Sequence, residues 1–163
     1  MKRLFFILLL VINDIGIKII INEKYFDLRF DIMGPFLGFA PRINNSNLSI
    51  YNSFFDLQIP YKIIFLLNIF ILFVFLLFFI LLNKETKGNR KAILLTNIFV
   101  IFIESGTICS LIDKIWLRGS LDYIKITHWI IDLKDIYIFL GVVSLFFTLI
   151  VIKVNELKRN KTN

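Results

Sequence analysis

The sequence has very little of the residue types from which most metal and nucleophilic sites are built. Its 163 residues include one cysteine, Cys109, and one histidine, His128. A lone cysteine forms no internal disulfide, and a single histidine beside it cannot complete a Cys/His zinc site. A Ser-His-Asp triad would have to be built on His128, and neither a nucleophile elbow nor a phosphate-binding glycine loop is present. We therefore predict no metal and no cofactor, and we interpret Cys109 as a buried, inert thiol.

Proline and glycine are also scarce, and long apolar stretches take their place. The chain has 3 Pro and 7 Gly against 19 Phe, and 58% of its residues are hydrophobic. Four runs approach the length of about 20 residues that a helix needs to cross a bilayer; they are Leu4–Asn22, Ile63–Leu82, Ala92–Ile112 and Ile136–Ile152. We predict an all-α polytopic membrane protein, with four transmembrane helices in one domain over residues 1–163. The first run would also fit a cleaved signal peptide, but no small-residue cleavage site follows it, so we expect a retained helix.

The basic residues predict how the helices are oriented. Ten lysines and arginines lie in short flanks on one side of the predicted bundle, and eight lie in two longer loops on the other side. By density, both termini face the cytoplasm, and the loops at 23–62 and 113–135 are extracytoplasmic. The net charge of +7 then reflects topology and contact with anionic lipid, and no nucleic acid is expected as a partner.

The first outer loop carries two patterns. Phe26–Ile32 alternates apolar and polar residues strictly, which is typical of a half-buried strand. That strand would belong to a small β-containing subdomain at the membrane surface, either as a substrate platform or as a cap with no ligand. Pro41–Ser49 is polar and rich in Asn. We interpret it as turns, although its amides would also suit hydrogen bonding to an extended peptide.

Acidic residues gather at the outer boundary of the predicted membrane: Asp113, Asp122, Asp132 and Asp135. A single carboxylate there is most simply solvated. Two carboxyls brought close together share a proton, because both cannot ionise easily, and such a pair can deprotonate a water while donating to a carbonyl. This chemistry needs none of the residue types that the sequence lacks. We expect Gly119-Ser120 to form the turn that folds Asp122 back toward the last helix.

Asp14 and Lys18 lie four residues apart within the first apolar run, and therefore on one face of a helix. Inside lipid they are expected to form an ion pair or to face the bundle interior, because an unpaired charge there is expensive. The side chain of Lys18 would extend toward the outer loops. Contact between helices and a functional role explain the pair equally well, and an ion relay in a small transporter is the weakest interpretation.

Five segments in chain order resemble the motifs of one bacterial family. Asp14-Ile-Gly-Ile-Lys18 resembles Asp-Gln-x-x-Lys, and Asn47-Leu-Ser-Ile-Tyr-Asn-Ser-Phe resembles Asn-x-Gly-x-Ala-Phe-Ser. Ser105-Gly-Thr-Ile-Cys-Ser-Leu-Ile-Asp113-Lys114 is similar to Gly-Gly-x-x-Gly-Asn-x-x-Asp-Arg, and Asp122-Tyr123 is similar to the Asp-Phe that follows it. Ile131-Asp-Leu-Lys-Asp135, with Gly141 further on, resembles Phe-Asn-x-Ala-Asp and its following glycine. The family is signal peptidase II, the lipoprotein signal peptidase, a four-helix intramembrane aspartic protease.

The resemblance implies an endopeptidase that removes signal peptides from lipid-modified prolipoproteins, cutting before the diacylglyceryl-modified cysteine. It also implies a location in the bacterial inner membrane, with membrane lipid as a partner, and we expect a monomer. Asp122 and Asp135 would be the catalytic pair. The supporting positions around them would be Asp14, Lys18, Asn47, Ser110, Asp113 and Lys114.

Five positions depart from the family pattern. Ser110 and Asp132 stand in place of Asn, Lys114 in place of Arg, Lys134 in place of Ala, and Asn52 in place of an aromatic residue. Lysine cannot make the two parallel hydrogen bonds with which the planar guanidinium group of arginine binds one carboxylate. Asp132 adds negative charge near the catalytic pair, and Lys134 adds a compensating positive charge. Because both catalytic aspartates are present we favour an active enzyme; the alternative is a catalytically inactive homologue that binds lipidated peptides or signal helices.

Overall fold

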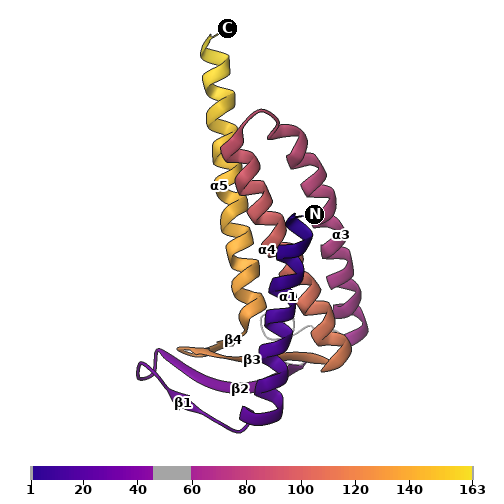
Figure 1. Ribbon diagram of the computed structural model, residues 1–163, viewed down its shortest axis with the longest axis vertical. Helices are drawn as coiled ribbons and strands as arrows, with labels where there is room; N and C mark the ends of the chain where they lie inside the picture. The colour runs from indigo at the N-terminus through magenta and orange to yellow at the C-terminus, as the bar shows by residue number, and fades with distance from the viewer. Residues whose placement is uncertain (1, 46–59, 163) are drawn as a thin grey trace.

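The computed structural model describes residues 2–45 and 60–162. Four long helices form a bundle, and a small sheet lies across one end of it (Figure 1). The helices are α1 (Lys2–Ile20), α3 (Tyr61–Glu85), α4 (Arg90–Trp116) and α5 (Leu133–Thr162), and a π-helical turn, η1 (Ile21–Tyr25), continues α1. The strands are β1 (Phe30–Asp31), β2 (Leu37–Asn45), β3 (Gly119–Ile126) and β4 (Trp129–Ile131), all antiparallel in the order β1-β2-β3-β4.

All four helices are long and apolar enough to cross a membrane. The predicted fold class, a polytopic membrane protein with four helices and a small β-containing subdomain, is therefore confirmed. Helices α3, α4 and α5 each contain one of the predicted apolar runs and continue past it into polar residues, whereas the first predicted run, Leu4–Asn22, extends from α1 into η1. At the start of α4, the Asn89 side chain accepts hydrogen bonds from the backbone N–H groups of Lys91 and Ala92 at 3.0 and 3.2 Å. Such a cap lets a helix begin before its apolar segment does.

The central helix of the bundle is α4, which packs against α1, α3 and α5 (Figure 1). Of its most apolar segment 56% is buried, against 6% for α3. The core at this level consists of Phe99, Val100 and Ile103 of α4 with Leu82 of α3. The many exposed leucine and phenylalanine side chains of α3 therefore suit contact with lipid, because exposing apolar side chains to lipid tails carries no free-energy penalty.

Gly141 of α5 lies against Ile103 of α4 with no room for a side chain. A Cβ at Gly141 would stand 2.6 Å from Ile103 Cγ1 and 3.2 Å from the Ile103 backbone nitrogen. We expect Gly141→Ala to push the two helices apart and to lower the free energy of unfolding by about 1–3 kcal/mol, measured by denaturant unfolding in detergent micelles. The matched control is Gly16→Ala on α1, where an added Cβ meets nothing within 4 Å and better helix propensity is worth about 1 kcal/mol. Equal stability of the two variants would contradict the close approach.

The strand predicted over Phe26–Ile32 is mostly wrong, because only Phe30–Asp31 forms a strand. The helix continues through η1, which buries Ile21 beside Leu121 and Tyr123 of β3, and Phe26 packs against the same cluster. Beyond that point the alternating apolar residues have no core to cover, and Leu28 is 47% exposed. Tertiary packing around Ile21 thus overrides the local period of two.

Pro41–Asn45, predicted to be turns, instead belongs to β2. Strand β3 supplies the hydrogen-bonding partner that the local sequence does not reveal, and Asn44 pairs with Ser120. The ladder shifts register between Phe39 and Arg42, which accommodates Pro41 because proline has no N–H to donate. The remainder of the predicted turn segment, residues 46–49, lies outside the described residues.

The expected turn at Gly119-Ser120 is also displaced. The chain reverses before it, at Arg118 with φ 51°, and Gly119 opens β3. A Cβ at Gly119 would stand 2.6 Å from the backbone oxygen of Asn44, so glycine is needed for the close approach of β2. The consequence is still the one expected: Asp122, on β3, is carried back toward the start of α5.

Candidate active site

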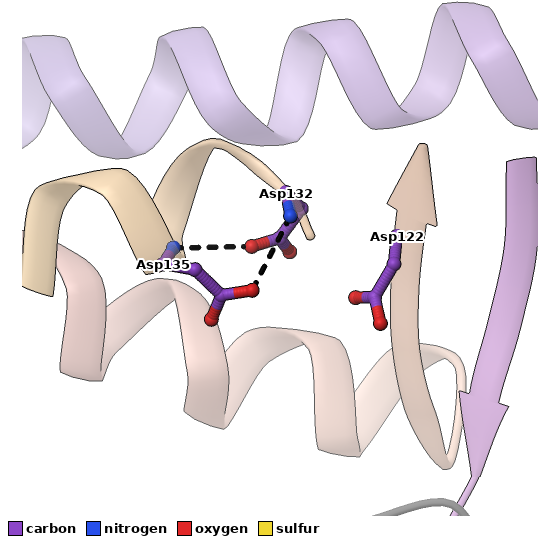
Figure 2. A group of neighbouring side chains, drawn as sticks. All are labelled: Asp122, Asp132 and Asp135. Carbon is purple, nitrogen blue, oxygen red and sulfur yellow. Dashed lines mark hydrogen bonds between the residues drawn. The ribbon is translucent and has the colours of Figure 1, made fainter. Parts of the chain in front are cut away.

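Three aspartates face one another where β3 meets the first turn of α5 (Figure 2). Asp122 projects from β3, Asp132 immediately precedes α5, and Asp135 lies in its first turn. Oxygens of the three carboxylates lie within 4.8 Å of one another. The Asp122 side chain is only 4% exposed, whereas that of Asp135 is 42% exposed. Asp122 and Asp135, called the dyad below, therefore combine one buried and one accessible carboxylate.

Asp132 and Asp135 hold each other in place at the N-terminus of α5. The backbone N–H of Asp135 donates to Asp132 Oδ1 at 3.2 Å, and the backbone N–H of Asp132 donates to Asp135 Oδ2 at 3.3 Å, as the dashed lines in Figure 2 mark. This reciprocal pairing is a capping box, which satisfies two backbone donors at the start of a helix. The first turn of α5 thereby sets the orientation of the Asp135 carboxylate.

Asp122 is positioned by the pairing of β2 with β3. The Asn44 side-chain amide donates to Asp122 Oδ2 at 2.8 Å, and the Ser120 hydroxyl lies 2.9 Å from Asp122 Oδ1. Burial raises the pKa of the Asp122 carboxyl, and the positive charge of Lys134 opposes that rise. A carboxyl with a raised pKa keeps its proton at higher pH than a solvated aspartate does. That property suits a pair of carboxyls that share a proton.

Lys18 of α1 is buried among three carboxylates. Its Nζ lies 2.8 Å from Asp14 Oδ2, 2.6 Å from Asp113 Oδ2 and 2.7 Å from Asp132 Oδ2, and none of the four side chains is more than 1% exposed. The ion pair with Asp14 is the one that the spacing predicted. These four residues, called the Lys18 cluster below, tie α1 to the end of α4 and to the start of α5.

Lys134 brings a second positive charge to the same place. Its Nζ contacts Asp132 Oδ2 and the Ser120 hydroxyl, and it lies 3.4 Å from Asp113 Oδ2. Burial alone would raise the pKa of Asp132, but the ammonium groups of Lys134 and Lys18 outweigh it and hold that pKa below its usual range. These contacts favour the ionised form of Asp132. This favours Asp135 over Asp132 as the second member of the dyad.

The whole site carries more negative than positive charge. The ammonium groups of Lys18 and Lys134, with that of Lys114 nearby, face five carboxylates: Asp14, Asp113, Asp122, Asp132 and Asp135. Carboxylates this close cannot all ionise in a buried setting, so a proton is shared among them. A water that bonds two carboxylates at about 2.8 Å each can bridge oxygens up to about 5.5 Å apart. The dyad therefore has the spacing and the charge to activate a water for attack on a carbonyl.

Ser110 and Lys114 of α4 form a second polar group with Asn68 of α3. Lys114 Nζ donates to Ser110 Oγ at 2.8 Å, and Ser110 Oγ donates to Asn68 Oδ1 at 3.0 Å. Both lie at the end of α4 that carries Asp113. The two remaining positions of the family pattern, Asn47 and Asn52, lie outside the described residues. The catalytic and supporting roles of all these residues stay predictions.

Sequence reasoning did not single out Asn44 or Ser120, although both bond Asp122. Asn44 lies 78 residues from its partner, and its own neighbours predict turns. Only the pairing of β2 with β3 identifies it. Cys109, by contrast, is a buried free thiol, as its position in an apolar run predicted.

Comparisons with known proteins agree with this architecture. The sequence model of a protein family described as signal peptidase (SPase) II matches residues 6–151. Two solved structures, each described as a bacterial membrane enzyme, are 20% identical to this chain, with TM-scores of 0.72 and 0.71. The first alignment covers 94% of this chain and 90% of the other, and the second covers 91% and 92%. At this identity the two structures support the fold alone. A search of curated protein sequences gives no match.

Proposed function

This chain belongs to the signal peptidase II family, and we propose from this premise that it is an intramembrane aspartic endopeptidase. Its substrates would be diacylglyceryl-modified prolipoproteins, cut immediately before the modified cysteine. Membership of the family already makes the chain a signal peptidase and a multi-pass membrane protein. The observation that carries the finer proposal is the dyad: a buried carboxylate and an accessible carboxylate, within 4.8 Å, at one end of the bundle.

The proposed reaction uses one ionised and one protonated carboxyl. The ionised carboxylate takes a proton from the bridging water while the water oxygen attacks the scissile carbonyl carbon, and the protonated carboxyl gives its proton to the carbonyl oxygen. The carboxyl that took the proton of the water then gives it to the amide nitrogen of the diol. The C–N bond breaks in this step, and the amine leaves. The second carboxylate recovers a proton from a diol hydroxyl, so the dyad ends with one shared proton.

The remaining predicted site residues would hold this dyad in place. The Lys18 cluster joins three helices beneath it, and Ser110 and Lys114 would act from α4, with Asn47 contributed by the outer loop. We propose that the sheet end faces outward and that both termini are cytoplasmic. Figure 1 supports a common side for the termini, since α1 begins and α5 ends away from the sheet. The substrate's apolar signal helix would enter from the bilayer, and the enzyme would act as a monomer.

The test is cleavage by the full-length protein in liposomes. The substrate is a prolipoprotein carrying diacylglyceryl on its cysteine, and the control is the same protein with serine at that position, which accepts no lipid. We expect mass spectrometry to find cleavage directly before the lipidated cysteine and an intact serine control. Absence of cleavage at every pH would overturn the proposal, and equal cleavage of both substrates would overturn the lipid requirement.

One observation favours a second candidate, a non-catalytic homologue that binds lipidated peptides. Lys134 Nζ lies 4.0 Å from an oxygen of each member of the dyad, so an ammonium group stands close to the position of the attacking water. Binding of the lipidated substrate to the liposomes without turnover, across the whole pH range, would support this candidate over the enzyme.

A further inference from the structure

Lys134, in the first turn of α5, lies close to both members of the dyad. It is buried, at 5% exposed, and its Nζ lies 4.0 Å from Asp122 Oδ1 and 4.0 Å from Asp135 Oδ1. The same ammonium group contacts Ser120 Oγ, which itself bonds Asp122 Oδ1 at 2.9 Å. A single positive charge, held against Asp132, thus also lies close to both carboxylates of the dyad.

The position of this lysine is not explained by the stability of α5. Lys134 is the second residue of the helix, where the partial positive charge of the helix N-terminus disfavours a cation. Its contact with Asp132 explains the position only in part, because Asp132 already has a first counter-charge in Lys18, which lies 2.7 Å from Asp132 Oδ2. The contacts that Lys18 does not supply in this arrangement are those to Asp122 and Asp135.

We propose that Lys134 is a positioning residue whose fixed positive charge between Asp122 and Asp135 sets the pH range over which the dyad carries a single proton. This inference rests on the proposed aspartic mechanism and deepens it. Lys134 would act through the two carboxylates and not on the substrate. The site would therefore work at lower pH than the same pair of carboxylates without a neighbouring cation.

The electrostatics of the site give the direction of the effect. Burial raises the pKa of Asp122, and Lys134 is the strongest influence against that rise. The charged groups that face Lys134 come from every element packed around it: Lys18 of α1, Asp113 and Lys114 of α4, Asp122 of β3, Asp132 before α5 and Asp135 within α5. Removing the Lys134 charge leaves the carboxylates in excess, so protonation of the dyad becomes easier and occurs at higher pH.

The test is the pH dependence of cleavage by the full-length protein in liposomes. Lys134→Met is expected to move both limbs of the pH–rate profile upward by about 1–3 pH units, the usual effect of an opposite charge at this distance. Lys134→Arg keeps the charge and is expected to keep the profile near that of the wild type. The matched control is Lys125→Met on β3, which removes a lysine whose ammonium group pairs with Asp31 at 2.7 Å; the pH–rate profile of this variant should not move.

A merely structural role for Lys134 gives a different result. Lys134→Met would then lower the rate at all pH values with the two limbs unmoved, and this outcome would overturn the inference. Failure of the wild type to cleave would instead overturn the proposed function. In that case the titration of Asp122 is followed without turnover, as the infrared difference between the protein and its Asp122→Asn variant. An unchanged Asp122 titration in Lys134→Met would contradict the inference, and an upward shift would support it.

Discussion

Replacing Asp122 by Asn is expected to slow cleavage of the lipidated substrate by about 10³-fold or more. The amide has nearly the same shape as the carboxyl but can neither accept the proton of the attacking water nor give one to the carbonyl oxygen. Asp135→Asn is expected to have an effect of the same size, because each mechanism step uses both carboxyls. The double variant should be hardly slower than either single one, since residues that act as a unit are not additive. Initial rates of cleavage at saturating substrate measure the loss of activity in the two single variants and in the double variant.

The matched control is Glu156→Gln, the same carboxylate-to-amide change at the other end of α5. Glu156 is 55% exposed and forms a solvent-exposed ion pair with Lys153 at 2.8 Å, so cleavage should be unchanged. Thermal unfolding of each variant shows whether the fold is intact. Retained cleavage by folded Asp122→Asn or Asp135→Asn would overturn the assignment of that residue to the dyad.

Replacing Lys18 by Met is expected to cause the largest loss of stability, about 3–5 kcal/mol in the free energy of unfolding. Methionine fills much of the space of the lysine chain but removes the counter-charge that three buried carboxylates share, and only Asp113 and Asp132 keep a second ammonium group, that of Lys134. Those carboxylates lie 2.6 to 2.8 Å from Lys18 Nζ, and an uncompensated buried charge is far more costly than an absent ion pair. Denaturant unfolding in detergent micelles measures the loss.

The control for Lys18→Met is Lys153→Met, which removes a lysine from an ion pair of the same length, 2.8 Å, that is 66% and 55% exposed. Exposed pairs are worth about 1 kcal/mol or less, so this variant should be nearly as stable as the wild type. Adding Asp14→Leu to Lys18→Met should recover part of the loss, because one stranded charge is removed. Equal losses for the two lysine variants would contradict the structural role of the Lys18 cluster.

The capping box explains a residue that the sequence pattern left ambiguous. Asp132 departs from the family pattern, and its charge suggested a disturbed catalytic pair. In the structure its carboxylate accepts the backbone N–H of Asp135 and meets two lysines. The two ammonium groups hold its pKa below the usual range, which favours the ionised form that pairs with Lys134 and Lys18. At the two positions that depart from the family pattern, the negative charge of Asp132 is therefore balanced by the positive charge of Lys134. The Lys134→Met variant consequently tests the effect of both departures.

Much of the architecture followed from local patterns. The four membrane helices are visible in apolar length alone, because crossing a bilayer imposes about 20 apolar residues whatever the surrounding fold. The Asp14–Lys18 ion pair follows from the four-residue spacing of a helix, and the gathering of acids at one boundary follows from the order of the spans. The small sheet was harder to predict from the sequence. The apolar–polar alternation over Phe26–Ile32 predicted a strand that packing around Ile21 prevents, and β2 lies where residues typical of turns dominate.

The composition of the site was decided by contacts between distant segments. Lys18 contacts Asp113, 95 residues further along the chain, and Asn44 contacts Asp122, 78 residues further along. No local pattern in the sequence predicts which strand pairs with which. The resemblance of the motifs predicts Asp135 and not Asp132 as a catalytic residue, but the two ammonium groups that contact Asp132, one of them from another helix, appear only in the structure. The length of an apolar run and the spacing of residues on a helix depend on residues that are close in sequence, so both can be recognised from the sequence alone. Charge balance in a buried site depends on distances through space, which exist only once α1, α4, α5 and the sheet have come together.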